Sequence, residues 1–194
     1  MENIENQIFS SYQRNPDLYD EIHDKKGKVK EVYQKLFNLY GEHSIKDYVT
    51  LNNKAKSSFF NQGITFQVYG ENNVQEKIFP FDLFPRIIDP VDWDIIERGS
   101  IQRSKALNLF LWDIYHDKKI LKDKVVPIEL ITSSANYLDQ MNGVNPPGGI
   151  YNHISGTDVI KHKDGKYYVL EDNIRCPSGV SYVICNRTTR IRKT

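Results

Sequence analysis

The sequence predicts an α+β fold in which helices pack on an antiparallel sheet. Apolar residues recur at helical spacing in much of the first sixty residues and again between residues 92 and 115. Strand-like alternation of apolar and polar residues occupies residues 64–69 and flanks the pair Asp164–Gly165. With 194 residues and 39% hydrophobic content, the chain is long enough to bury a core.

The first part of the chain, residues 1–60, is predicted to be a helical N-terminal segment. The motif Asn15-Pro16-Asp17 is typical of a helix start. An apolar stripe over residues 29–40 predicts one helix, and a second helix is expected from about residue 45 to residue 60.

Residues 61–149 are predicted to form a mixed α/β lead-in region. Residues 64–69 alternate as a strand, and residues 79–90 hold three prolines, which favours a loop or edge segment. The longest helix is expected over residues 92–115, and its basic residues, Arg103 among them, are interpreted as a solvated helix face.

Residues 150–194 are predicted to contain a β-hairpin followed by a loop or helix. Asp-Gly between alternating segments is the strongest short-range hairpin signal. If Asp164 and Gly165 form a two-residue loop, Asp158 lies directly opposite Glu171. Side chains alternate along a strand, so Asn173 shares the face of Glu171. Three oxygen-bearing side chains are therefore expected to converge on one face.

Two directly opposed acids need a compensating charge, because like charges across an antiparallel pair are destabilising. Carboxylate and amide oxygens suit a hard cation such as Mg²⁺. Apolar residues on both faces predict a hairpin buried on both sides, where acids are normally paired or bound to metal. The alternative is a pair of solvated acids on an exposed face, and a longer loop would shift the pairing.

The residues after the hairpin have the groups that bind an anion such as phosphate. Arg175 continues the alternation, and its guanidinium matches a phosphate in geometry. The following turn, Cys176-Pro177-Ser178-Gly179, is able to offer backbone N–H groups and a hydroxyl. The alternatives are a salt bridge from Arg175 to its neighbour Asp172 and a simple reversal of the chain.

Composition narrows the range of partners. The net charge is +1, with 26 basic and 25 acidic residues, which gives no electrostatic case for a nucleic acid or a membrane. Cys176 and Cys185 are expected to be free thiols in a reducing compartment. Without an apolar N-terminal run or a long apolar stretch, we expect neither a signal peptide nor a membrane span, and a cytoplasmic location.

Several of these motifs together resemble a known family. An acid, twelve residues and then Glu-x-Asn, with a Pro and a Gly after it, resembles the magnesium-binding end of ATP-grasp ligases. Residues 146–149 (PPGG), 153–160 (HISGTDVI), 164–175 (DGKYYVLEDNIR) and 177–187 (PSGVSYVICNR) resemble the circularly permuted ATP-grasp proteins (type 2) of bacteria. So do the upstream segments GITFQVYG, FPFDLFPRII and IERGSIQRSKALNLFLWDIY.

This resemblance covers about residues 50–187 and has two departures. An acid is usual where Cys185 stands, and the last residues, TTRIRKT, do not continue the family pattern. In the permuted family the nucleotide-binding lobes follow the metal motif. The sequence is therefore expected to hold an incomplete ATP-grasp-like sheet that ends in the metal-binding hairpin.

The resemblance implies an ATP-dependent carboxylate–amine ligase, in which an amine captures an acyl phosphate made with ATP. The residues that would hold Mg²⁺ are Asp158, Glu171 and Asn173. Arg175 would stabilise the transferring phosphoryl group and contact the nucleotide. Ser178 and Gly179 would complete that cofactor-binding turn and help to place the acceptor.

Alone, this chain is expected to be inactive and to lack saturable ATP binding. ATP and the carboxylate and amine substrates would bind the complete protein, or this chain together with a separate chain that supplies the missing half. The alternative is a non-catalytic truncated or split-gene product that acts, if at all, as a binding or interaction module. The downstream reading frame would distinguish the two.

Overall fold

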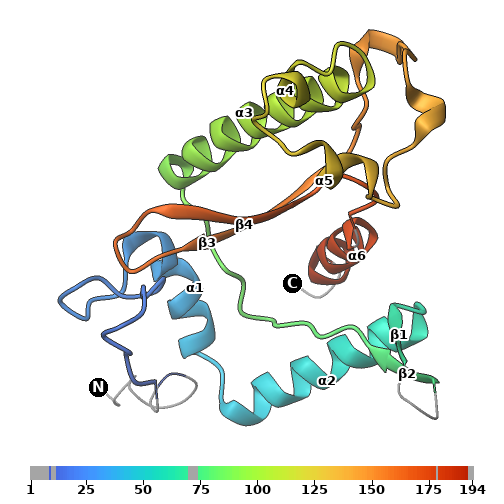
Figure 1. Cartoon of the computed structure of the whole chain (residues 1–194). Helices are drawn as coiled ribbons and strands as arrows, with labels where there is room; N and C mark the ends of the chain where they lie inside the picture. Colours follow the sequence, from blue (N-terminus) through green and yellow to red (C-terminus); the bar gives the residue numbers. More distant parts are fainter. Residues whose placement is uncertain (1–8, 10–11, 70–73, 178, 192–194) are drawn as a thin grey trace. The chain divides into compact units, whose positions relative to one another are not determined.

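The computed structural model describes residue 9 and residues 12–69, 74–177 and 179–191 (Figure 1). In that part of the chain, helices combine with two small antiparallel sheets, so the fold is α+β. The chain divides into two compact units. The first unit takes the described residues up to 89, residues 161–166 and those from 179 onward, and the second takes residues 90–160 and 167–177.

In the residues that the structure describes, the first unit is built from three helices and one two-stranded sheet. Its elements are α1 (Glu31–Gly41), α2 (Ile45–Asn61), β1 (Thr65–Tyr69), β2 (Val74–Ile78) and α6 (Val180–Ile191). The two strands pair antiparallel, with Thr65 opposite Ile78. Phe59 and Tyr33 are the largest side chains that are fully buried, and they mark the core of this unit.

Helix α2 begins and ends where its sequence specifies. The Ser44 hydroxyl accepts a hydrogen bond from the Asp47 N–H at 3.1 Å, and the Asp47 carboxylate accepts one from the Ser44 N–H at 3.0 Å. This reciprocal pair is a capping box, which satisfies two of the backbone N–H groups at a helix N-terminus. Just beyond the helix, Gly63 takes a positive φ of 65°, where glycine is favoured.

A segment without regular secondary structure, residues 79–89, is held in place by two tyrosines of helix α1. The Tyr33 hydroxyl accepts a hydrogen bond from the Ile87 N–H at 2.8 Å and donates to the Ile87 carbonyl at 3.4 Å. The Tyr40 hydroxyl donates to the Leu83 carbonyl at 2.6 Å. The segment is therefore fixed by side chains although it contains no helix or strand.

The second unit carries the long helix and most of the β-hairpin. Its elements are α3 (Pro90–Tyr115), α4 (Lys119–Lys122), α5 (Ile128–Thr132), the 3-10 turns η1 (Asp139–Met141) and η2 (Pro147–Gly149), β3 (Gly156–Lys161) and β4 (Tyr167–Asn173). The tip of the hairpin, residues 161–166, groups with the first unit.

Helix α3 organises the second unit through side chains along its length. The Asn108 amide donates to the Gly149 carbonyl at 2.7 Å and accepts from the Tyr151 N–H at 2.8 Å. Near the end of the helix, Tyr115 stacks on Tyr137 and Tyr151, with ring centroids 5.2 and 5.6 Å away. The turn that leads into the hairpin is thus tied to the helix before β3 begins.

Most of the expected elements are present. The predicted helices over residues 45–60 and 92–115 are confirmed within two residues at each end. The predicted helix start at Asn15-Pro16-Asp17 is wrong, because residues 16–18 form a turn that does not continue into a helix, with the Asn15 side chain accepting a hydrogen bond from the Asp17 N–H at 2.9 Å. Strand β2 was not predicted. No described helix combines the length and apolar character that crossing a membrane requires.

Candidate functional site

The hairpin closes with a three-residue loop. The His162 N–H donates to the Lys166 carbonyl at 2.9 Å, and the Gly165 N–H donates to the His162 carbonyl at 2.8 Å. Gly165 has a φ of 80°, as a type I turn followed by a left-handed glycine requires. The predicted two-residue loop is therefore wrong, and at the turn the pairing is displaced by one residue.

At the open end of the hairpin, the pairing of β3 with β4 differs by one residue from the pairing at the turn. A Cβ built on Gly156 would lie 3.8 Å from the Cβ of Asn173, which places these two residues opposite each other. The Thr157 hydroxyl donates to the Asp172 carboxylate at 2.9 Å. Between the turn and this end, β4 uses one residue more than β3, so we infer a one-residue bulge in β4.

The bulge restores the pairing that the longer loop displaces. The Asn173 amide donates to the Glu171 carboxylate at 3.2 Å, so these two side chains lie on one face. Asp158 follows Thr157, whose side chain lies with Asp172 on the other face, so by alternation Asp158 shares the face of Glu171 and Asn173.

This face is open to solvent. Asp158, Glu171 and Asn173 are all exposed. Ile160, two residues along β3 from Asp158, is 43% exposed. These exposures differ from the expectation of a hairpin buried on both sides.

The donor set on the open face suits a hard cation. It offers two carboxylates and one amide, and oxygen ligands of this kind are those that Mg²⁺ accepts. Among the described residues, no three His, Cys, Asp or Glu side chains gather where they could hold one metal ion. A site here would therefore depend on the amide oxygen of Asn173 and on other oxygens from water or substrate.

The neighbouring acid, Asp172, is held on the opposite face by helix α3. The Arg103 Nε donates to both carboxylate oxygens of Asp172, at 3.2 and 3.0 Å, and a second guanidinium nitrogen contacts one of them. The hydrogen bond from Arg103 holds the pKa of Asp172 below its usual range, against the effect of burial and with help from Thr157. The Asp172 side chain is only 9% exposed.

Arg103 was interpreted as part of a solvated helix face. Its side chain is 44% exposed, in line with that interpretation, but the sequence did not reveal its ion pair with Asp172. The two partners are 69 residues apart in the sequence, so local spacing carries no signal for this ion pair. The consequence is that two adjacent acids, Glu171 and Asp172, have different environments: Asp172 is neutralised against α3, and Glu171 is exposed on the open face.

We expect Asp172→Asn to lower the free energy of unfolding by about 1 kcal/mol, because the carboxylate is buried and accepts several hydrogen bonds. The matched control is Asp94→Asn, since Asp94 pairs with Arg98 where the two side chains are 62% and 72% exposed. Urea denaturation of both variants measures the difference. Equal midpoints for the two would contradict this account of Asp172.

The remaining predicted residues are less closely grouped. Arg175 donates to the Asn136 side chain at 2.9 Å, so its alternative pairing with Asp172 is not observed. Ser178 lies outside the described residues. Gly179 belongs to the first unit, where its carbonyl accepts a hydrogen bond from the Val183 N–H at 3.1 Å at the start of α6. Among the predicted ligands, the structure thus joins Glu171 with Asn173.

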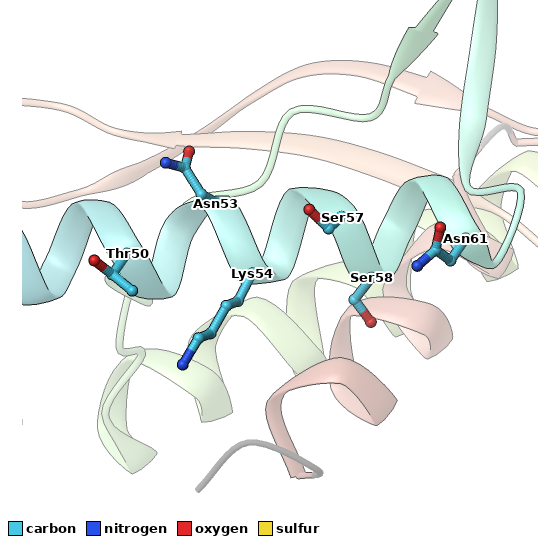
Figure 2. A pocket seen from close by; sticks show the side chains of 6 residues that line it. All are labelled: Thr50, Asn53, Lys54, Ser57, Ser58 and Asn61. Atoms are coloured by element: carbon cyan, nitrogen blue, oxygen red, sulfur yellow. The ribbon is translucent and has the colours of Figure 1, made fainter.

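A surface hollow of about 540 Å³ lies along α2, and Figure 2 shows the side chains that line it. They are Thr50, Asn53, Lys54, Ser57, Ser58 and Asn61. All six come from one helix and none is an acid, a cysteine or a histidine. This hollow is therefore the polar side of a helix and does not offer the ligands of a catalytic centre.

Comparison with known proteins points to one family. A family model described as a circularly permuted ATP-grasp matches residues 85–194. An uncharacterised protein of Synechocystis sp. is 41% identical over 170 residues, which cover 88% of this chain and 35% of that protein. An uncharacterised protein of Mycobacterium tuberculosis is 42% identical over 192 residues, covering 95% of this chain and 33% of that protein.

More distant relatives carry the name of an enzyme. A protein of Frankia alni, provisionally named glutamate–cysteine ligase 2-3, is 32% identical over 177 residues, which cover 89% of this chain and 20% of that protein. The chain spans about a third of the length of the first relatives it matches.

Proposed function

Since this chain belongs to the circularly permuted ATP-grasp family, we propose that it supplies the magnesium-binding hairpin of an ATP-dependent carboxylate–amine ligase. The provisional ligase name of the relative from Frankia alni supports amide formation as the reaction class. Because the chain spans only part of its relatives, the ATP and the carboxylate and amine substrates are assigned to the complete protein, or to this chain with a separate partner chain.

The observation that carries this proposal is the sorting of three adjacent side chains. Asp172 is buried and satisfied by Arg103, whereas Glu171 and Asn173 lie together on the open face. Asp158, which the alternation along β3 assigns to that same face, would lie opposite Glu171, and two such acids need a compensating charge. A bound divalent cation gives this arrangement a function, because it removes the repulsion between the two carboxylates.

In this proposal Asp158, Glu171 and Asn173 provide oxygen ligands, and Mg²⁺ supplies charge neutralisation for the phosphates of bound ATP. Arg175 adds a positive charge where the phosphoryl group is transferred. Its hydrogen bond to Asn136 positions the guanidinium before substrate binds. Ser178 and Gly179 contribute to the anion-binding turn.

We further propose a cytoplasmic location. The structure has two free cysteines, an exposed Cys176 and a half-buried Cys185, as expected for a reducing compartment.

Mn²⁺ tests the metal site directly, because it takes the same carboxylate, carbonyl and water ligands as Mg²⁺ and broadens nearby NMR signals. Added to the chain, Mn²⁺ is expected to broaden the amide signals of residues 157–159 and 171–173 first, and Mg²⁺ should reverse the effect by competition. Broadening that begins at other acids, such as those of α3, would contradict the proposed ligands.

A further inference from the structure

A second hollow, of about 820 Å³, lies in the first unit between the segment of residues 79–89 and helix α6. Two half-buried aromatic rings, Phe81 and Phe84, supply much of its apolar surface, together with prolines. Three polar side chains line it with them: Arg86, Asn186 and Arg187. The lining therefore combines flat apolar surface with two cationic groups and an amide.

Both walls of this hollow are fixed before any ligand binds. On the segment, the Tyr48 hydroxyl donates to the Asp82 carboxylate at 3.0 Å, and burial followed by this bond raises the pKa of Tyr48 to about 12. On α6, Tyr182 stacks on Phe79 with ring centroids 4.2 Å apart and donates to the Thr65 carbonyl at 3.0 Å. A preformed cavity loses less conformational freedom when it binds a ligand.

The side-chain amide of Asn186 has an unsatisfied hydrogen-bond acceptor. Its Oδ1 is buried and, within the described part of the chain, accepts no hydrogen bond. A buried acceptor without a donor is costly to the folded state, and such atoms need an explanation. A ligand that brings an N–H or O–H group into the hollow would supply the missing donor.

The charged groups favour an anion. Arg187 is exposed and forms no ion pair with any residue that the structure describes. Arg86 directs its Nε to Glu21 at 2.8 Å, and its side chain is 76% exposed. The one acid of the lining, Asp82, already accepts hydrogen bonds from Tyr48 and from the Phe84 N–H at 2.9 Å.

We propose that this hollow binds a small carboxylate that also carries an N–H donor and a flat apolar group, as N-acylated amino acids do. The carboxylate pairs with Arg187, assisted by Arg86. The N–H donates to the Asn186 Oδ1, and the apolar group packs on Phe81 and Phe84. This site is separate in its residues from the hairpin ligands, so it does not depend on the proposed ligase activity.

Hippurate, which is N-benzoylglycine, is the probe that tests this proposal. Titrated into the intact chain, it is expected to bind saturably and to shift the amide signals of residues 81–86 and 186–187. Two neutral or altered analogues isolate its groups. Hippuramide lacks the negative charge, and 3-benzoylpropionate replaces the N–H with a methylene, so both should bind more weakly than hippurate.

Matched variants assign these losses to residues. Arg187→Gln should weaken the binding of hippurate by about tenfold, as expected for the loss of one charge-assisted contact. It should leave the affinity for hippuramide unchanged. Asn186→Leu should lower the affinity for hippurate more than it lowers the affinity for 3-benzoylpropionate. It should also raise the melting temperature, because it removes a buried acceptor that lacks a donor. Arg98→Gln, at an exposed ion pair of the other unit, is the control and should change neither affinity.

Several results would overturn the proposal. Hippurate and hippuramide binding equally well would remove the role of the arginines. Inorganic phosphate competing as strongly as hippurate would show a general anion site in place of a carboxylate site. Loss of hippurate binding in Asn186→Leu with no gain in thermal stability would mean that Asn186 is satisfied in the free protein.

Discussion

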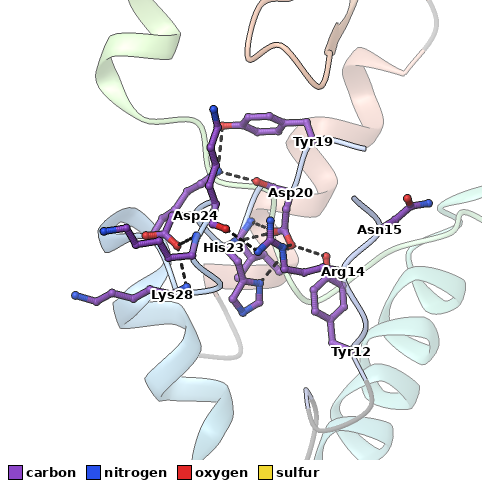
Figure 3. Close-up of polar contacts among 12 residues, drawn as sticks. Tyr12, Arg14, Asn15, Tyr19, Asp20, His23, Asp24 and Lys28 are labelled. Atoms are coloured by element: carbon purple, nitrogen blue, oxygen red, sulfur yellow. Dashed lines mark hydrogen bonds and ion pairs between the residues drawn. The ribbon is translucent and has the colours of Figure 1, made fainter. Parts of the chain in front are cut away.

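Asp20→Asn is expected to be the most destabilising polar substitution in the first unit, with a loss of about 3 kcal/mol in the free energy of unfolding. The Asp20 side chain is 6% exposed. It accepts hydrogen bonds from the Tyr12 hydroxyl at 3.0 Å and from the N–H groups of Ile22 and His23 at 2.9 and 2.8 Å, and Arg14 lies 3.5 Å away (Figure 3). The Asn side chain has one accepting oxygen, and its NH2 group is a donor, so it cannot accept hydrogen bonds at both positions as the carboxylate does.

The same network predicts how the loss depends on pH. Burial acts to raise the pKa of Asp20, but the hydrogen bonds from His23 and Tyr12 outweigh the effect of burial. The pKa of Asp20 in the folded protein is therefore below its ordinary value. A group with a depressed pKa stabilises the fold at pH values above its unfolded pKa, about 4, and loses that contribution as pH falls through the folded pKa. The wild type should therefore approach the Asp20→Asn variant in stability as pH falls below about 4.

Thermal unfolding at neutral pH provides the measurement, and a fall of roughly 10 °C in Tm is expected for a protein of this size. Asp24→Asn is the matched control. Asp24 also accepts backbone hydrogen bonds, from Lys26 at 2.8 Å and Lys28 at 2.9 Å, but these bonds are exposed and Asp24 itself is only half-buried, so water replaces much of the lost contact. An equal fall in Tm for the two variants would show that the burial of Asp20 contributes nothing to stability.

Glu171→Gln is expected to weaken metal binding at the hairpin and, in a complete family member that carries this segment, to abolish ATP-dependent turnover. The change keeps the size of the side chain and its ability to accept the hydrogen bond from Asn173. It removes one of two apposed negative charges, so the affinity for Mn²⁺ should fall by at least about tenfold while the fold stays intact or gains stability.

The control for this variant is Glu97→Gln, the same substitution at an exposed position of α3. It should leave both Mn²⁺ affinity and stability unchanged. Comparing the two variants separates a local effect at the hairpin from a general loss of negative charge. Wild-type Mn²⁺ affinity in Glu171→Gln would end the assignment of this face as the metal site.

Local signals in the sequence were sufficient for much of the fold. The helices α2 and α3 followed from apolar periodicity, and the hairpin followed from Asp164-Gly165 between alternating segments. The segment of residues 79–89 was correctly expected to be irregular from its prolines. Its attachment to Tyr33 and Tyr40 was not foreseen, because those contacts join residues more than forty positions apart.

The hairpin shows where local reasoning stops. Asp-Gly fits a two-residue loop and a three-residue loop equally well, and the choice depends on which residue takes the left-handed conformation. Here it is Gly165 alone. The bulge in β4 has no local signal of its own. The pairing of Arg103 with Asp172 required the tertiary structure for the same reason.

The combination of a three-residue loop and a bulge also constrains how this hairpin is able to evolve. Two length changes, one at the tip and one within β4, offset each other so that Asp158 and Glu171 emerge on the same side. A single insertion or deletion between them would turn one acid away from the other, even if every ligand residue were retained. Related proteins are thus free to vary the tip in composition, whereas a change in its length survives selection only when a compensating change accompanies it in β4.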